Sequence, residues 1–149
     1  MDREEIDDSI LFDLAKETHF QGEIGPPSSS LTLSNPLCGD EVTFFLRLNE
    51  SKKVEEIRYK TKGCFICKAT AAALCKFSDK KEKDQILLLT AKFRSEFVSG
   101  ENESTGIVEF QVLHELRKFP TRSKCVLLPF EALTGVLTGP KGSVPSEPL

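Results

Sequence analysis

The chain of 149 residues has 39% hydrophobic and 29% charged residues, values typical of a globular domain. Its formal net charge is −3, from 20 basic and 23 acidic residues that form no basic block, which argues against nucleic acid as a partner. The sequence shows neither a secretory signal pattern nor an apolar run of about 18 residues, so we expect a cytoplasmic protein that does not engage a membrane. In a reducing compartment, the five cysteines are better explained by metal binding or reactive thiols than by disulfides.

The first predicted element is an amphipathic helix at about residues 3 to 17, where apolar side chains repeat at helical spacing. A loop rich in glycine, proline and serine follows at residues 21–34. Alternating apolar and polar residues then predict a strand over residues 42–48 and a second strand over residues 57–61. The polar residues 49–53 between them predict a hairpin turn.

The hairpin bears on the cysteines, because Cys38 and Asp40 precede its first strand and Cys64 follows its second. Antiparallel pairing would bring these three residues to the same end of the hairpin. Sixty residues separate Cys64 from Cys125, and 25 residues separate Cys38 from Cys64, so the spacing fits no local zinc finger. Only tertiary folding could unite the four residues in one site.

Four helical segments are predicted from Phe65 onward. An alanine-rich helix should run from Phe65 to Phe77, and Ser78 should cap another helix from about Asp79 to Phe97. A third helix is expected over residues 107–116. Pro129 would delete a helical hydrogen bond, so the last helix is expected to begin near Leu128. Residues 139–149 are rich in proline, glycine and serine and are expected to be disordered.

Three thiolates and the carboxylate of Asp40 would make a tetrahedral site that prefers zinc or iron to magnesium or calcium. A carboxylate ligand is released more readily than a thiolate, so such a site could exchange a ligand. The alternative is that Cys38, Cys64 and Cys125 are ordinary buried residues and that Asp40 is a turn acid.

Three further residues are accessory candidates. Cys67 forms a Cys-x-x-Cys pair with Cys64 and could be a spare ligand, a resolving thiol or a packed residue. Arg122 and Lys124 flank Cys125 and are either part of the site or solvated surface charges. Cys75 is expected to pack in the core, because helix geometry places it about 16 Å along the helix from Cys64.

Three motifs occur in order along the chain: NPLCGD at residues 35–40, KGCFIC at residues 62–67 and RSKC at residues 122–125. In these motifs the chain resembles the U-type iron–sulfur cluster assembly family, which comprises IscU, SufU and the N-terminal domain of NifU. The resemblance extends from about Ile6 to Leu137. It implies an α+β fold in which a small three-stranded antiparallel sheet packs against a layer of helices, within a single domain at residues 1–138.

The resemblance also implies a third strand near residues 28–33 and a surface site of Cys38, Asp40, Cys64 and Cys125 that holds zinc or a transient iron–sulfur cluster. Lys124 and the long interval before it look like the SufU branch, in which the residue matching Cys38 receives a persulfide sulfur. At Cys67 the chain departs from the family, which commonly has alanine or a small hydroxylated residue there.

Two functions remain open. The first is a metal-bound carrier that accepts persulfide sulfur from a cysteine desulfurase, a sulfurtransferase-like activity. The second is a non-enzymatic scaffold that binds a transient iron–sulfur cluster and transfers it to apoproteins. A structural zinc domain that serves only as an interaction module is a third, weaker interpretation.

Overall fold

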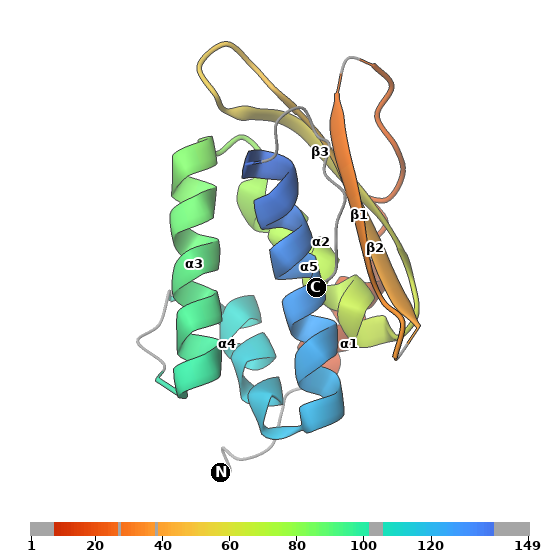
Figure 1. The fold of residues 1–149 in the computed structure, drawn as a ribbon, viewed down its shortest axis with the longest axis vertical. Helices are drawn as coiled ribbons and strands as arrows, with labels where there is room; N and C mark the ends of the chain where they lie inside the picture. The colour runs from red at the N-terminus through yellow and green to blue at the C-terminus, as the bar shows by residue number, and fades with distance from the viewer. Residues whose placement is uncertain (1–7, 27, 38, 102–105, 139–149) are drawn as a thin grey trace.

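The computed structural model describes residues 8–26, 28–37, 39–101 and 106–138. It has two layers, a three-stranded sheet and a set of helices that covers one face of that sheet (Figure 1). In chain order the elements are α1 (Asp8–Lys16), β1 (Ser29–Asn35), β2 (Asp40–Leu48), β3 (Val54–Lys62), α2 (Phe65–Ser78), α3 (Lys83–Ser99), α4 (Val108–Glu115), the 3₁₀ turn η1 (Leu116–Lys118) and α5 (Pro120–Thr138). This architecture confirms the α+β fold.

The sheet has the strand order β1-β2-β3, and both pairs are antiparallel. In the central strand β2, the alternate side chains Val42, Phe44 and Leu46 are buried against the helices, as expected for a sheet with one face on the core. The predicted turn between β2 and β3 is confirmed, and the Asn49 side chain accepts two backbone N–H bonds inside it. β1 is the third strand that the family resemblance implied, and it corrects the loop that composition predicted over residues 21–34, because pairing with β2 holds this segment extended.

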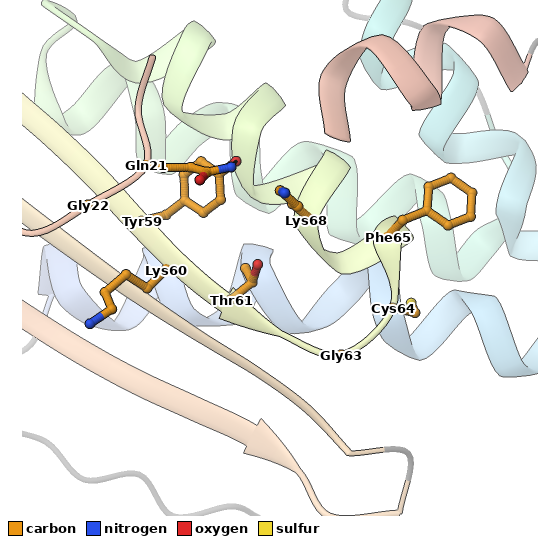
Figure 2. A pocket seen from close by; sticks show the side chains of 9 residues that line it. All are labelled: Gln21, Gly22, Tyr59, Lys60, Thr61, Gly63, Cys64, Phe65 and Lys68. Atoms are coloured by element: carbon orange, nitrogen blue, oxygen red, sulfur yellow. Dashed lines mark hydrogen bonds between the residues drawn. The ribbon is translucent and has the colours of Figure 1, made fainter. Parts of the chain in front are cut away.

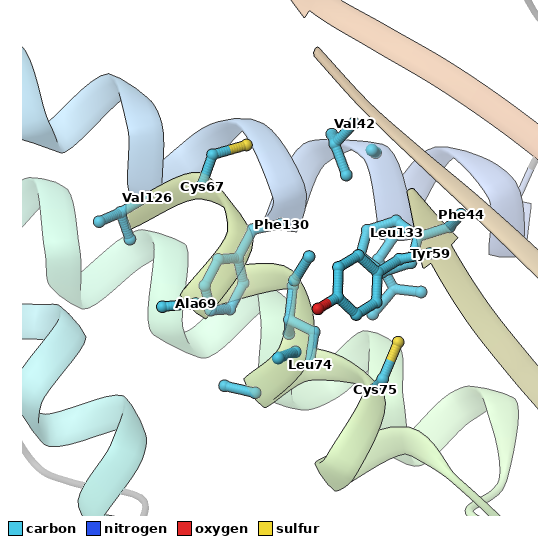
Figure 3. Packing of buried hydrophobic residues seen from close by; sticks show 14 of the residues in the cluster. Val42, Phe44, Tyr59, Cys67, Ala69, Leu74, Cys75, Val126, Phe130 and Leu133 are labelled. Carbon is cyan, nitrogen blue, oxygen red and sulfur yellow. The ribbon is translucent and has the colours of Figure 1, made fainter. Parts of the chain in front are cut away.

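Helix α2 lies at the centre of the helical layer and packs against α1, α5 and β3. Its alanines are buried, and their small side chains allow the neighbouring elements to approach closely. An aromatic cluster joins the outer helices, with Phe93 of α3 stacked on Phe130 of α5 at 4.2 Å between ring centroids and Phe110 of α4 beside both. Figure 3 shows Phe130 and Leu133 of α5 in the same cluster as Leu74 of α2.

The start of α3 differs from the prediction. Ser78 is the last residue of α2 rather than a cap, and α3 begins at Lys83. The connection between the helices instead pairs with the start of β3, where the backbone N–H of Val54 donates to the Lys81 carbonyl and that of Lys80 donates to the Val54 carbonyl. These tertiary hydrogen bonds hold the connection in a non-helical conformation.

The start of the last helix was also predicted wrongly, because α5 begins at Pro120 and not near Leu128. Proline is favoured at the first helical position, where its missing N–H costs nothing. Pro129 lies inside the helix and is itself buried, next to the fully buried Phe130. Burial of the apolar face of α5 that contains Pro129 and Phe130 outweighs the helical hydrogen bond that Pro129 cannot donate.

Some sequence predictions fall outside the described residues. These are the first turn of the predicted helix at residues 3–17 and the disordered tail at residues 139–149; α1 covers the described part of that helix. Among the described residues, no helix combines the length and the apolar character needed to cross a bilayer.

Replacing Phe130 with alanine should lower the free energy of unfolding by about 3–5 kcal/mol, because the ring is fully buried and stacked on Phe93. Urea denaturation measures this loss. The matched control is Leu88→Ala on α3, where the side chain is 72% exposed and the change should stay within about 0.5 kcal/mol. Equal effects of the two substitutions would contradict the aromatic core.

Candidate metal centre

The end of the hairpin brings Asp40 and Cys64 together, as the strand order predicted. Asp40 is the first residue of β2, and its neighbour Glu41 pairs with Lys62, the last residue of β3. The chain then turns through Gly63 to Cys64, which precedes the first residue of α2. The backbone N–H of Cys64 donates to Oδ1 of Asp40 at 3.0 Å.

Gly63 makes this approach possible for two reasons. Its φ of +116° lies in the region that favours glycine. A Cβ atom at this position would also collide with the Asp40 carboxylate and would lie 2.8 Å from the Asp40 Cα. Any other residue would therefore displace Asp40 from the start of α2.

Helix α5 supplies the third group from a distant part of the chain. The Sγ atom of Cys125 lies 3.2 Å from Sγ of Cys64 and donates to the Thr121 carbonyl at 3.6 Å. Sγ of Cys64 lies 4.0 Å from Oδ2 of Asp40. One ligand atom from each of Asp40, Cys64 and Cys125 can be chosen so that all three lie within 4.8 Å of one another.

These three groups differ in exposure. Asp40 is 1% exposed and Cys125 is 5% exposed, whereas Cys64 is half-buried. Burial, reinforced by the neighbouring Asp40 and Cys64, raises the pKa of the Cys125 thiol well above its ordinary value. Cys125 is therefore protonated at neutral pH when no cation is nearby.

The donor set suits a soft cation such as zinc. Tetrahedral zinc with Zn–S bonds of about 2.3 Å holds two sulfurs about 3.8 Å apart. The 3.2 Å contact between Cys64 and Cys125 would thus have to open by about 0.6 Å when zinc binds. Two sulfurs and one carboxylate leave a fourth position, for which the sequence predicts Cys38. Cys38 lies outside the described residues.

The other cysteines lie in the core. Cys67, in the first turn of α2, and Cys75, near its end, are both fully buried (Figure 3). Burial raises the pKa of the Cys75 thiol well above its ordinary value. The prediction that Cys75 packs in the core is confirmed. The accessory candidates Arg122 and Lys124 have exposed side chains on the first turns of α5.

A groove beside the cluster was not predicted from the sequence. It has a volume of about 670 Å³ and lies between the end of β3 and the first turn of α2 (Figure 2). Cys64 and Lys68 line it together with Gln21, which is joined to Tyr59 of β3 by an isolated bridge. The composition of the segment that begins at Gln21 predicts a loop but not its position, so only the folded structure shows that it forms a wall next to Cys64.

Comparison with protein families gives a match over residues 7–125 to the NifU-like N terminal domain. The chain is 30% identical over 127 residues to the iron-sulfur cluster assembly scaffold protein IscU of Streptococcus pyogenes serotype M1, covering 84% of this chain and 78% of that protein. It is 26% identical over 126 residues to the zinc-dependent sulfurtransferase SufU of Bacillus subtilis (strain 168), covering 83% of this chain and 84% of that protein.

Solved structures support the fold. The crystal structure of FiSufU from Fervidobacterium islandicum AW-1 superposes with a TM-score of 0.77 at 24% identity, covering 87% of this chain and 94% of the other. That of the N-terminal part of a NifU-like protein from Brucella abortus gives a TM-score of 0.75 at 18% identity, covering 89% and 92%. The layered arrangement of three strands and helices is therefore shared with experimentally determined structures.

Substituting Gly63 with alanine should weaken zinc binding at least tenfold, because the new Cβ displaces Asp40 from Cys64. Gly22→Ala is the matched control, since Gly22 also has a positive φ of +131° but has no atom near the new Cβ. Backbone strain should cost each variant about 1–2 kcal/mol of stability, and the collision with Asp40 should add to that loss in Gly63→Ala. Competition with a zinc chelator measures the affinity, and equal weakening in both variants would show that strain alone is responsible.

Zinc affinity should rise with pH, because the raised pKa of Cys125 means that this thiol must lose its proton when zinc binds. At a pH below that pKa, the proton on Cys125 competes with zinc for the sulfur. As the pH rises, less of the thiol is protonated and this competition weakens. Calorimetric titration in buffers of different ionisation enthalpy counts the protons released. Cys125→Ser should release about one proton fewer per zinc than the unmodified chain, whereas Cys75→Ser should release the same number.

Proposed function

This chain belongs to the family of the NifU-like N-terminal domain, and on that basis we propose that it serves iron–sulfur cluster assembly as a zinc-bound acceptor of persulfide sulfur from a cysteine desulfurase. Such a protein is a sulfurtransferase-like carrier of the SufU kind. We place it in the cytoplasm, where thiols remain reduced.

The observation that carries this proposal is the convergence of Asp40, Cys64 and Cys125 from three different elements within 4.8 Å. Ordinary buried cysteines would not require an aspartate beside them. Burial of a carboxylate is costly unless hydrogen bonds or a cation compensate it. Oδ1 of Asp40 accepts the backbone N–H of Cys64, and Oδ2 lies 4.0 Å from the Cys64 sulfur. A cation bound between Asp40, Cys64 and Cys125 would explain why these three side chains lie together.

We assign Cys38 as the fourth ligand and as the sulfur acceptor. It stands two residues before Asp40 in the sequence, next to the point where β2 begins. A thiolate held by zinc is protected from oxidation and becomes a nucleophile when another ligand replaces it. The role of Cys38 in the proposal rests on its place in the family motif.

The transfer step is a thiol–persulfide exchange. The Cys38 sulfur attacks the outer sulfur of the desulfurase persulfide, and the bond between that sulfur and the desulfurase cysteine breaks. The desulfurase cysteine leaves as a thiol and Cys38 becomes the persulfide. Arg122 and Lys124 present positive charges on the first turns of α5, which suits them to an accessory role in contact with the partner enzyme.

The second candidate is a scaffold that builds a transient iron–sulfur cluster on the same residues and passes it to apoproteins. The relative from Streptococcus pyogenes carries the name of such a scaffold. The ligand set supports this function as well, because thiolates bind iron–sulfur clusters and the carboxylate of Asp40 would be the most easily displaced ligand. In the first candidate the cysteines hold zinc and a persulfide sulfur, and in the second they hold an iron–sulfur cluster.

Zinc-loaded protein should stimulate the turnover of a cysteine desulfurase with cysteine by roughly tenfold, equivalent to ~1.4 kcal/mol of barrier, and mass spectrometry should find an added sulfur on Cys38. Cys38→Ser should abolish both effects. Cys75→Ser is the control, because Cys75 is buried in the core and should leave sulfur acceptance unchanged.

Absence of stimulation, together with a cluster that can be reconstituted on the same cysteines, would replace the carrier with the scaffold. Equal loss of sulfur acceptance in Cys38→Ser and Cys75→Ser would contradict the site assignment altogether.

A further inference from the structure

The first turn of α2 carries two cysteines in the Cys-x-x-Cys spacing. Cys64 is the N-cap residue, with φ −80° and ψ 162°, and the helix begins at Phe65. The backbone N–H of Lys68 donates to the Cys64 carbonyl at 3.4 Å, so Cys64 and Cys67 span the first helical turn. Helix geometry puts Cα atoms three residues apart at about 5 Å, inside the range of about 4.4–6.8 Å that disulfides occupy.

The two thiols differ in accessibility. Cys64 is half-buried and lines the groove next to Gln21 and Lys68, so a reagent in the groove can reach it. Cys67 is fully buried one turn further along the helix. An accessible thiol at a helix N-terminus followed three residues later by a buried thiol is the arrangement of dithiols that exchange with other sulfur species. Cys67 is protected from external reagents but is within one turn of Cys64.

We infer that Cys64 and Cys67 form a two-electron dithiol that reduces persulfide sulfur to sulfide, with Cys67 as the resolving thiol. This activity deepens the proposed function, on which it rests for its supply of persulfide. The sulfur in a persulfide is formally S⁰, whereas the sulfur that enters an iron–sulfur cluster is S²⁻. Two electrons must therefore be delivered, and two thiols that form one disulfide supply that number.

The reaction proceeds in two exchanges. First, Sγ of Cys64 attacks the outer sulfur of the incoming persulfide, the donor leaves as a thiol, and Cys64 carries the persulfide. Second, Sγ of Cys67 attacks Sγ of Cys64, the bond to the outer sulfur breaks, and that sulfur leaves as hydrogen sulfide. One persulfide and two protein thiols thus give one donor thiol, one sulfide and one Cys64–Cys67 disulfide.

Cys125 is the competing resolving thiol, because its Sγ lies 3.2 Å from Sγ of Cys64. Cys67 is favoured because it has no place in the proposed ligand set of Cys38, Asp40, Cys64 and Cys125. Resolution by Cys67 also joins residues that the first helical turn already holds close together, with a loop of only two intervening residues.

The test uses the full-length chain, reduced and freed of metal, mixed with a small excess of glutathione persulfide. Sulfide is measured colorimetrically over a single turnover, and peptide mapping by mass spectrometry locates any disulfide. About one sulfide per chain is expected beyond a protein-free control, together with a Cys64–Cys67 disulfide. Because a small molecule supplies the persulfide, this experiment is independent of any desulfurase and of stimulation through Cys38.

Cys67→Ser and Cys67→Ala should slow sulfide release at least tenfold and leave a persulfide on Cys64. Cys75→Ser is the matched control, since Cys75 is equally buried on the same helix and should release sulfide at the unmodified rate. Zinc binding by the Cys67 variants, unchanged if they fold, separates loss of chemistry from loss of structure. Unchanged sulfide release in folded Cys67 variants, or a Cys64–Cys125 disulfide in the unmodified chain, would overturn the inference.

Discussion

The carboxylate of Asp40 accepts a hydrogen bond from the backbone N–H of Cys64, and this contact joins the beginning of β2 to the beginning of α2. It depends on Gly63, which has a positive φ and no Cβ to displace the carboxylate. The bond serves two purposes. It satisfies an N–H at the start of a helix, where no helical carbonyl is available, and it orients a buried acid toward two thiols. The geometry of the sulfur site follows from it.

Each group in the site is held by an element that the core fixes in place. Asp40 belongs to the central strand of the sheet, Cys64 precedes the central helix, and Cys125 lies on α5, whose inner face is buried with Phe130. Helix α5 packs against β1, β2 and α2, so it contacts both layers that supply the other two groups. The site lies at the junction of the sheet and the helical layer, where packing between the two layers positions all three groups.

The cysteines of this chain acquire different chemistry from their surroundings. Cys64 is accessible from a groove, Cys125 is buried beside an acid and another sulfur, and Cys67 and Cys75 are buried in α2 at opposite ends of the helix. Proximity to Asp40 makes Cys64 and Cys125 candidates for metal binding. Cys67 lies one helical turn from Cys64, which makes it a candidate resolving thiol. Cys75 lies near the other end of α2, far from Cys64, and contributes to packing. The persulfide carrier and the iron–sulfur scaffold would both use the same cluster of Asp40, Cys64 and Cys125.

Local patterns in the sequence determined strands β2 and β3, the hairpin turn and the alanine-rich helix, because side-chain alternation and helix propensity act over a few residues. They also determined that Asp40 and Cys64 meet, since a hairpin brings its two ends together. They did not determine β1, which lies in a segment whose composition predicted a loop. The tertiary structure alone decided that Cys125 reaches Cys64, that α3 starts at Lys83 and that α5 continues through Pro129. In each of these cases the deciding contacts lie between segments far apart in the chain, and their burial or hydrogen bonding outweighs the local preference.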